Sequence, residues 1–253
     1  MEQSFIFNKV LFTQYHTRYF NSPHFYCRKG FKDIYASLCR YTCERNLDDL
    51  VKGRWYVNRR KSFSDKYEFG EFPLPFQVWL DEESTKNHNE TYQRIRQSIH
   101  ETELIPAICL TKWDKWDKYF FWKTYTDNNG ICIVFSLENF VKAISNNGFD
   151  FFMSKMEYKD LIKNPDYDTI PFSKTPSYTP EKEYRIYLQN KNGTAIEGDQ
   201  GIDINVDFEI LNPVIVISPF CNYSNRYSEL IKKYPSLKGH LKKSKLIEST
   251  NHK

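Results

Sequence analysis

The chain has 253 residues, a length that suits one large domain or two small ones. Hydrophobic residues make up 40% of the sequence, and its 20 Phe, 18 Tyr and 5 Trp can fill a core and also offer rings for stacking. The net charge of +4 permits a polyanionic partner without requiring one, and no apolar run approaches the roughly 20 residues of a membrane span.

Features that report on the compartment favour the cytoplasm. The first residues do not join a charged region to an apolar stretch, so we expect no secretory signal and no membrane contact. Six cysteines are scattered without a C-x-x-C pair, and their intervals fit no zinc site. Scattered thiols in a lysine-rich chain are typical of a reducing compartment.

The first half of the chain mixes strand and helix patterns after an aromatic N-terminus. Residues 1–30 show no regular pattern and are expected to form an irregular aromatic extension. Patterns of apolar residues and turn-forming residues then define the elements. In chain order we predict a strand at 38–42, a helix at 46–51 begun by Asn46 and ended by Gly53, a strand at 55–57, a loop at 62–75, a polar helix at 80–105 and a strand at 105–111.

The second half contains the most apolar predicted strand, which covers residues 131–136 and should be buried on both faces. A Trp-dense amphipathic segment at 112–125 and a turn at 127–130 precede it. In chain order we then predict a helix at 137–145, a strand or bend at 156–158, a Pro-rich loop at 163–180, strands at 183–188, 202–210 and 214–217, a helix at 226–234 and a strand at 242–247.

These elements do not alternate regularly as βαβ units, which indicates the α+β class. We expect a single domain over residues 1–253, with a core at 31–248. Its architecture should be a mixed, mostly antiparallel central sheet with flanking helices.

The sequence lacks the common catalytic motifs, including phosphate-binding glycine loops, G-x-S-x-G and H-E-x-x-H. Its six His are isolated, which argues against a metal site or a triad built on His. Arg40 stands in a predicted strand among apolar neighbours, so it must be paired or face a cleft, unless it lies on an exposed edge. Ser62 and Ser64 follow another strand, where hydroxyls can orient a substrate or simply form a turn.

The third polar group is Glu181-Lys182-Glu183-Tyr184-Arg185, which enters a strand after a Pro-rich loop. Strand alternation places Glu181, Glu183 and Arg185 on one face, with Tyr184 on the other. Two carboxylates and a guanidinium suit the wall of a cleft, or a solvated ladder of ion pairs.

Three stretches of the chain resemble a widespread bacterial family of domains of unknown function. The family pattern runs as K/R-Y, then S-F-N-D-P-F-E, then W-x-x-Y…G, then E-x-E-W/Y-R. This chain departs from it at Ser64 and Lys66, where the pattern has Asn and Pro. The matching stretches are Arg40–Thr42 with Lys61–Glu68, Trp122–Tyr125 with Gly130–Phe135, and Glu181–Arg185.

The order of Arg40, Ser62-Phe63-Ser64 and Glu181-Lys182-Glu183 also resembles ADP-ribosyltransferase toxins of the Arg-Ser-Glu class. This resemblance implies an ADP-ribosyltransferase-like fold and NAD as the cofactor, with no metal. It further implies a toxin or an anti-phage defence effector. An antitoxin or chaperone protein would then be a further partner.

The resemblance also implies a role for each residue around a ribose–nicotinamide bond. Cleavage of that bond has an oxocarbenium-like transition state, which a carboxylate stabilises. Glu183 would supply this charge, and Glu181 would assist the acceptor nucleophile. The residues expected to bind NAD are Arg40, Tyr41 and Thr42 on the first strand, Ser62 or Ser64 orienting the glutamate, and Tyr125 or Tyr184 stacking on nicotinamide.

The favoured acceptor is nucleic acid, RNA or DNA, because the chain is mildly basic and rich in aromatic residues. Basic residues concentrate at Arg54–Lys61 and at Lys238–Lys245, and the former is the expected contact with the acceptor. Two alternatives remain open. One is a non-catalytic module that binds a nucleotide or nucleic acid, and the other is a metal-dependent nuclease using Asp65, Glu68, Glu181 and Glu183.

Overall fold

The protein is described by a computed structural model, in which one large sheet organises the chain. The described residues are 4–7, 10–18, 20–59, 104–114, 118–159, 172–174, 176–194, 196–198 and 200–246. Within these ranges no helix is both long and apolar enough to cross a membrane.

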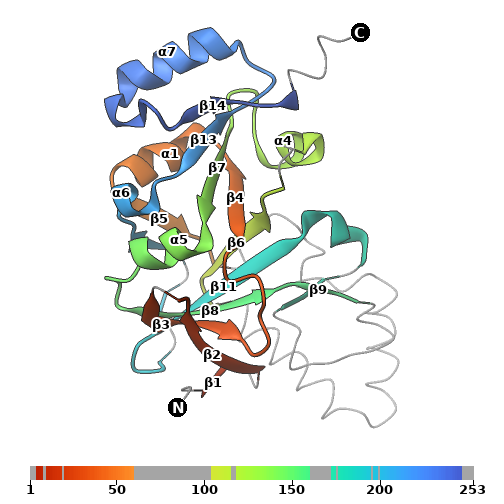
Figure 1. Ribbon diagram of the computed structural model, residues 1–253, viewed down its shortest axis with the longest axis vertical. Helices are drawn as coiled ribbons and strands as arrows, with labels where there is room; N and C mark the ends of the chain where they lie inside the picture. The colour runs from red at the N-terminus through yellow and green to blue at the C-terminus, as the bar shows by residue number, and fades with distance from the viewer. Residues whose placement is uncertain are drawn as a thin grey trace.

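The large sheet has ten strands, in the order β1-β2-β3-β8-β11-β6-β4-β7-β13-β14 (Figure 1). Neighbours are antiparallel except for the β3–β8 and β13–β14 pairs, so the predicted mixed, mostly antiparallel sheet is confirmed. Its strands are β1 (Ser4–Phe7), β2 (Val10–His16), β3 (Asn21–Arg28), β8 (Phe149–Lys155), β11 (Glu183–Asn190), β6 (Ala107–Lys112), β4 (Ser37–Thr42), β7 (Ile131–Ser136), β13 (Val214–Ile217) and β14 (Leu241–Lys243).

Short helices and two small sheets surround this sheet. One small sheet pairs β5 (Arg54–Val57) with β12 (Ile202–Asn205), and the other pairs β9 (Glu157–Tyr158) with β10 (Ser173–Lys174). The helices are α1 (Glu44–Val51), α4 (Tyr119–Tyr125), α5 (Leu137–Ala143), α6 (Phe208–Leu211) and α7 (Tyr223–Lys233), with 3₁₀ turns η3 (Pro176–Glu181) and η4 (Pro235–Leu237).

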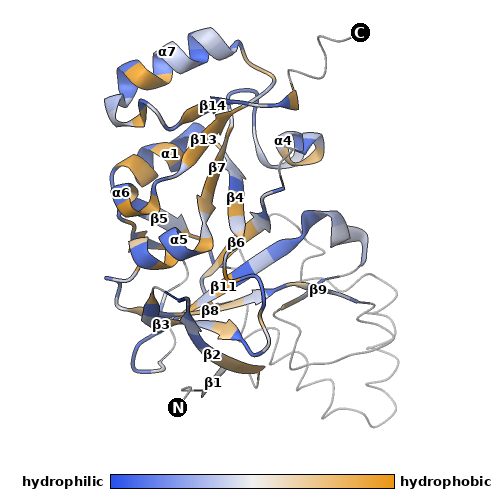
Figure 2. Ribbon diagram, in the orientation of Figure 1, coloured by the Kyte–Doolittle hydropathy of each residue, from blue (hydrophilic) through white to orange (hydrophobic). Residues whose placement is uncertain are grey.

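The two faces of the sheet bury different sets of side chains. Leu38, Ile133 and Tyr184 belong to the larger core, which α1 and α5 cover. Tyr41 and Trp122 belong to a smaller core on the opposite face, under α4. Figure 1 shows α4 on the other side of the strands from α1 and α5, and Figure 2 shows the apolar character of β7 and β13 between them.

Most predicted strands are confirmed, because β-branched and aromatic runs are buried as expected. All of Ile131 to Phe135 is buried, so the prediction that this strand is central is confirmed. The irregular extension expected at residues 1–30 is wrong, since β1, β2 and β3 extend the main sheet through β8. The helix expected at 80–105 lies almost wholly outside the described residues.

Three predicted boundaries differ from the structure for local reasons. The first helix begins at Glu44, and Asn46 lies inside it, where its side chain donates a hydrogen bond to Thr42 Oγ1. The strand expected at 202–210 stops at Asn205, because Asp207 caps the short helix α6 by accepting from the Ile210 amide at 2.9 Å. The Pro-rich loop is also interrupted, since β10 and η3 lie within it.

Candidate functional site

The polar centre of the molecule lies where β11 begins. Glu183 is the first residue of β11, and its register partner on β6 is Thr111. Glu181 closes the turn η3, and Lys182 between them has a positive φ of 46°. The Thr111 hydroxyl donates to the backbone carbonyl of Glu181, which fixes this turn against the sheet. The two carboxylates are thus brought together by a tight change from 3₁₀ turn to strand.

Lys174 on β10 lies between the two carboxylates. Its Nζ is 2.6 Å from Glu181 Oε2 and 2.6 Å from Glu183 Oε2. Arg185 donates both Nε and Nη2 to Glu183 Oε1, each at 2.9 Å. None of the four side chains is more than 8% exposed. We call these four residues the Lys174 cluster, and its formal charges balance when both glutamates are ionised.

Three tyrosines surround the Lys174 cluster and tie it to other elements. Tyr125 at the end of α4 donates its hydroxyl to Glu181 Oε1 at 2.6 Å. The Tyr158 hydroxyl accepts from the Glu183 amide at 2.7 Å, and the Tyr178 ring lies 5.0 Å from Lys174 Nζ. Tyr125 is 45% exposed, so it links the buried carboxylate of Glu181 to the surface.

The pKa values of the two glutamates are shifted in opposite directions. Burial raises the pKa of Glu181 above its ordinary value, and the attraction of Lys174 offsets only part of this effect. Burial also opposes ionisation of Glu183, but the charges of Arg185 and Lys174 outweigh it and hold its pKa below the ordinary value. Neighbouring carboxylates with separated pKa values are the usual arrangement for one proton-transfer group beside one permanently charged group.

The cluster geometry allows carboxylate chemistry at a sugar carbon. Because both glutamates contact the same Nζ atom, the two contacting oxygens lie within about 5 Å of each other, near the roughly 5–5.5 Å spacing of the two carboxyl groups that flank the scissile bond in retaining glycosidases. A fixed negative charge can stabilise an oxocarbenium ion, and a carboxylate of raised pKa can accept a proton.

Arg40 is not brought together with these glutamates. Cys39 pairs with Thr111, which pairs with Glu183, so these three side chains share one face of the sheet. As the next residue in β4, Arg40 points to the opposite face, where its guanidinium lies 5.3 Å from the Trp55 ring. The expected joint action of Arg40 and Glu183 on one ligand is therefore not supported by their placement.

The other predicted binding residues are divided between the two faces. Tyr41 shares a face with Glu183 and stacks on Phe121, with ring centroids 5.1 Å apart. Tyr184 lies on the Arg40 face and is buried, and its hydroxyl donates to Asp33 at 2.5 Å. Thr42 is also on that face. Ser62, Ser64, Asp65 and Glu68 lie outside the described residues.

Of the two arrangements expected at the E-x-E motif, the solvated ladder of ion pairs is wrong. Glu181, Glu183 and Arg185 are buried, because Lys174 supplies the second cation that the sequence analysis missed. The Pro-rich surroundings of Lys174 predict a loop there. The signal in the sequence is the short apolar-to-polar segment Phe172-Ser173-Lys174, which resembles a strand only weakly.

The basic segment 54–61 is not simply a solvated face. Arg54 pairs with Asp49 at 3.0 Å. Arg59 is buried, and its guanidinium donates to the backbone carbonyls of Gln200, Leu104, Ile196 and Glu197. Arg59 therefore serves the fold, Arg54 is 47% exposed, and Arg60 and Lys61 lie outside the described residues.

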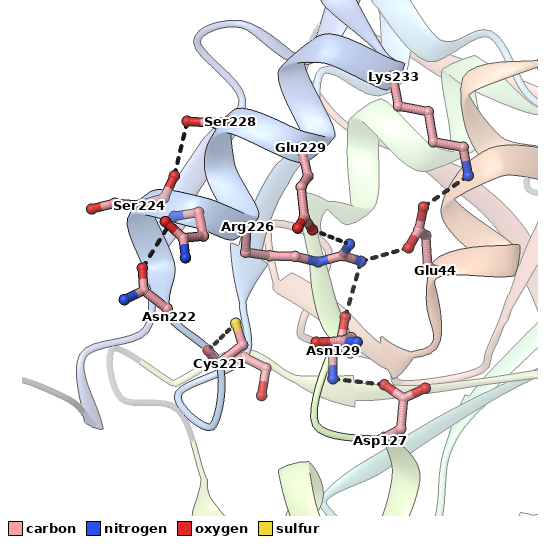
Figure 3. A network of polar contacts seen from close by, with 12 residues as sticks. Glu44, Asp127, Asn129, Cys221, Asn222, Ser224, Arg226, Ser228, Glu229 and Lys233 are labelled. Carbon is pink, nitrogen blue, oxygen red and sulfur yellow. Dashed lines mark hydrogen bonds and ion pairs between the residues drawn. The ribbon is translucent and has the colours of Figure 1, made fainter.

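A second ionic network joins α1 to α7 at the other end of the molecule (Figure 3). Arg226 Nη2 is 2.7 Å from Glu44 Oε2, and Lys233 Nζ is 2.8 Å from Glu44 Oε1. Arg226 Nη1 contacts Glu229 at 3.2 Å, and Nη2 also donates to the Asn129 carbonyl. Glu229 and Lys233 are more than half exposed. We call Glu44, Arg226, Glu229 and Lys233 the Arg226 cluster.

Within the described ranges, no group of three or more His, Cys, Asp or Glu side chains is arranged to hold a metal ion. Comparison of the chain with protein-family models, curated proteins and solved structures finds no match.

Proposed function

We propose that the protein is an enzyme that breaks the ribose–nicotinamide bond of NAD and transfers ADP-ribose, with the Lys174 cluster at its active site. The observation that carries this proposal is the shared Lys174 contact. It holds side by side two carboxylates whose pKa values are shifted in opposite directions. The exposed ring of Tyr125, hydrogen-bonded to Glu181, gives the substrate an approach to this pair.

The reaction would divide its demands between the two glutamates. The bond from ribose C1′ to nicotinamide breaks, and its electron pair leaves on the ring nitrogen, so that nicotinamide departs as a neutral molecule. Glu183, held ionised by Arg185 and Lys174, supplies the negative charge opposite the oxocarbenium ion. The acceptor's lone pair then bonds to C1′, and its proton passes to Glu181.

Tyr125 offers a stacking surface for the nicotinamide of NAD, because it ends a column of aromatic rings. Tyr41 stacks on Phe121, and Phe121 stacks on Tyr125 with centroids 5.7 Å apart. A planar nicotinamide on the exposed side of Tyr125 would extend the column beside Glu181. Arg40 lies on the opposite face, so the proposal assigns it no part in the bond that breaks.

Incubation of the wild-type protein with millimolar NAD, with nicotinamide measured by chromatography, tests this proposal. We expect nicotinamide release, and labelled ADP-ribose on an added RNA or DNA oligonucleotide. Glu181→Gln should reduce transfer to the oligonucleotide more than it reduces NAD hydrolysis, because its role concerns the acceptor. NAD should also raise the melting temperature of the wild-type protein, since it binds the folded state.

Two results would replace the proposal by one of its alternatives. A rise in melting temperature with NAD and no nicotinamide release would favour a non-catalytic binding module. Cleavage of an oligonucleotide that requires Mg²⁺, without any use of NAD, would favour a nuclease.

A further inference from the structure

Helix α4 carries an unusual amount of exposed aromatic surface. Tyr119 is 57% exposed and Phe120 is 54% exposed, and Tyr125 at the end of the same helix is also open to solvent. These three are among only nine large hydrophobic side chains that are exposed in the described part of the chain. A seven-residue helix thus holds a third of them, which marks this surface for contact with a partner.

Lysine side chains lie among these rings. Lys123 Nζ is 4.1 Å from the centre of the Phe220 ring and 5.9 Å from that of Tyr119, and the two rings themselves meet edge to face. Lys118 Nζ lies 5.4 Å from the Phe121 ring. We call Tyr119, Phe120, Lys123 and Phe220 the α4 surface. Its rings come from α4 and from the segment after β13, and its cation comes from α4.

The charge around the α4 surface favours an anionic partner. Lys242 pairs in register with Val216, which belongs to the same apolar cluster as Trp122 under α4, and Lys242 is exposed. Asp114, before the helix, is paired with Lys118 at 3.4 Å and with Lys182 at 3.0 Å. Asp127, after the helix, is exposed and accepts from the Asn129 amide.

We propose that the α4 surface binds single-stranded nucleic acid, which is the acceptor of the transfer. Unpaired bases stack on exposed aromatic rings while lysines contact the phosphates, and a duplex keeps its base faces covered. A protein partner fits less well, since lysine is depleted at the centre of protein interfaces. The role as acceptor rests on the proposed function, but the binding itself does not.

The position of α4 connects this surface with the Lys174 cluster. Tyr119 and Tyr125 lie at opposite ends of a helix roughly 9 Å long. Tyr125 donates to Glu181, the glutamate assigned to the acceptor, at 2.6 Å. A strand stacked on Tyr119 and Phe120 therefore has a short path to the carboxylate that would accept its proton.

Binding is tested by fluorescence anisotropy with labelled 20-nucleotide poly(dT) and poly(rU) and the wild-type protein, without NAD so that no transfer occurs. Tyr119→Ala with Phe120→Ala should weaken binding about tenfold or more, because base–aromatic stacking is lost. Lys123→Ala should weaken binding and make it less dependent on salt. Tyr35→Ala is the matched control, since this ring is 61% exposed but lies outside the surface.

Absence of binding at low salt, or equal binding by the double variant, would overturn the inference. So would a dimer, detected by sedimentation, that the double variant loses, because the rings would then serve a second copy of the chain. If wild-type protein binds the oligonucleotides but releases no nicotinamide, the inferred surface stands and the proposed enzymatic function fails.

Discussion

The Lys174 cluster and the Arg226 cluster use the same residue types in different surroundings. In the Arg226 cluster, Glu44 joins α1 to α7 at a surface where Glu229 and Lys233 remain largely hydrated (Figure 3). The Lys174 cluster is buried in the sheet, where each charge depends on its partner for solvation. The first cluster ties two helices together around Arg226, which is itself buried while Glu229 and Lys233 are exposed. The second costs desolvation energy that a pair of apolar residues would not, which is why we assign function to it.

Removal of the shared lysine should give the largest difference between the clusters. Lys174→Met leaves Glu181 and Glu183 facing each other in a buried site and should lower the free energy of unfolding by about 3–5 kcal/mol. Lys233→Met, the same change in the Arg226 cluster, should have a much smaller effect because Glu44 keeps Arg226 and water. Urea unfolding of both variants measures the contrast, and equal losses would contradict it.

The two glutamates of the Lys174 cluster should respond to pH with opposite signs. The raised pKa of Glu181 means that its contribution to stability is present at low pH and is lost as pH rises through that pKa. The lowered pKa of Glu183 means that its contribution is present above about pH 4.3 and is lost as pH falls through the lowered value. Glu181→Gln should thus cost less stability at pH 7 than at pH 4.5.

Glu183→Gln should show the reverse trend, with a larger cost at pH 7 than at pH 3.5. Unfolding free energies of both variants and the wild type across this range provide the measurement. Identical pH trends for the two variants would show that the glutamates do not differ as described.

The sequence predicted the polar residues of β11 better than their surroundings. The E-x-E pair was visible because carboxylates entering a β-branched and aromatic strand need partners. Lys174 was not, because its partners depend on how β10 docks after a Pro-rich stretch. The sequence could not predict that Arg40 and Glu183 lie on opposite faces of the sheet. Alternation along β4 does not relate its side chains to those of β11 until the register through Thr111 is known.

The fold was likewise predictable only in part, for the strands with a clear local pattern. The compact apolar runs of β7 and β13 predicted strands, and the residues before β7 predicted a turn. Strands β2, β3 and β8 mix aromatic with polar residues, and they become regular only by pairing with one another. Their place in the sheet is a tertiary property that local pattern does not contain.

Loss of a single hydroxyl should have a moderate effect at the edge of the Lys174 cluster. Tyr125→Phe removes the hydrogen bond to Glu181 and should lower the free energy of unfolding by about 1 kcal/mol. This bond lowers the pKa of Glu181, so its loss should move the corresponding limb of the pH–rate profile to higher pH. Tyr119→Phe, a matched change on the same helix, should leave that limb in place.

The smallest effect is expected from a carboxylate of the Arg226 cluster. Glu44→Gln weakens contacts that are partly hydrated and should change the free energy of unfolding by less than about 1 kcal/mol. Thermal unfolding at low and high salt provides the measurement. A loss as large as that of Lys174→Met would mean that the two clusters do not differ in the way their burial indicates.

Nicotinamide release by wild type, Glu183→Gln and Glu44→Gln tests the central claim most directly, because both variants replace a glutamate by its amide within an ionic cluster. Melting curves first establish that each variant is folded at the assay temperature. The account predicts that Glu183→Gln lowers turnover roughly a hundredfold or more, with little change in NAD affinity, and that Glu44→Gln turns over as the wild type does. Near-wild-type release by Glu183→Gln would contradict the claim that the Lys174 cluster is the active site.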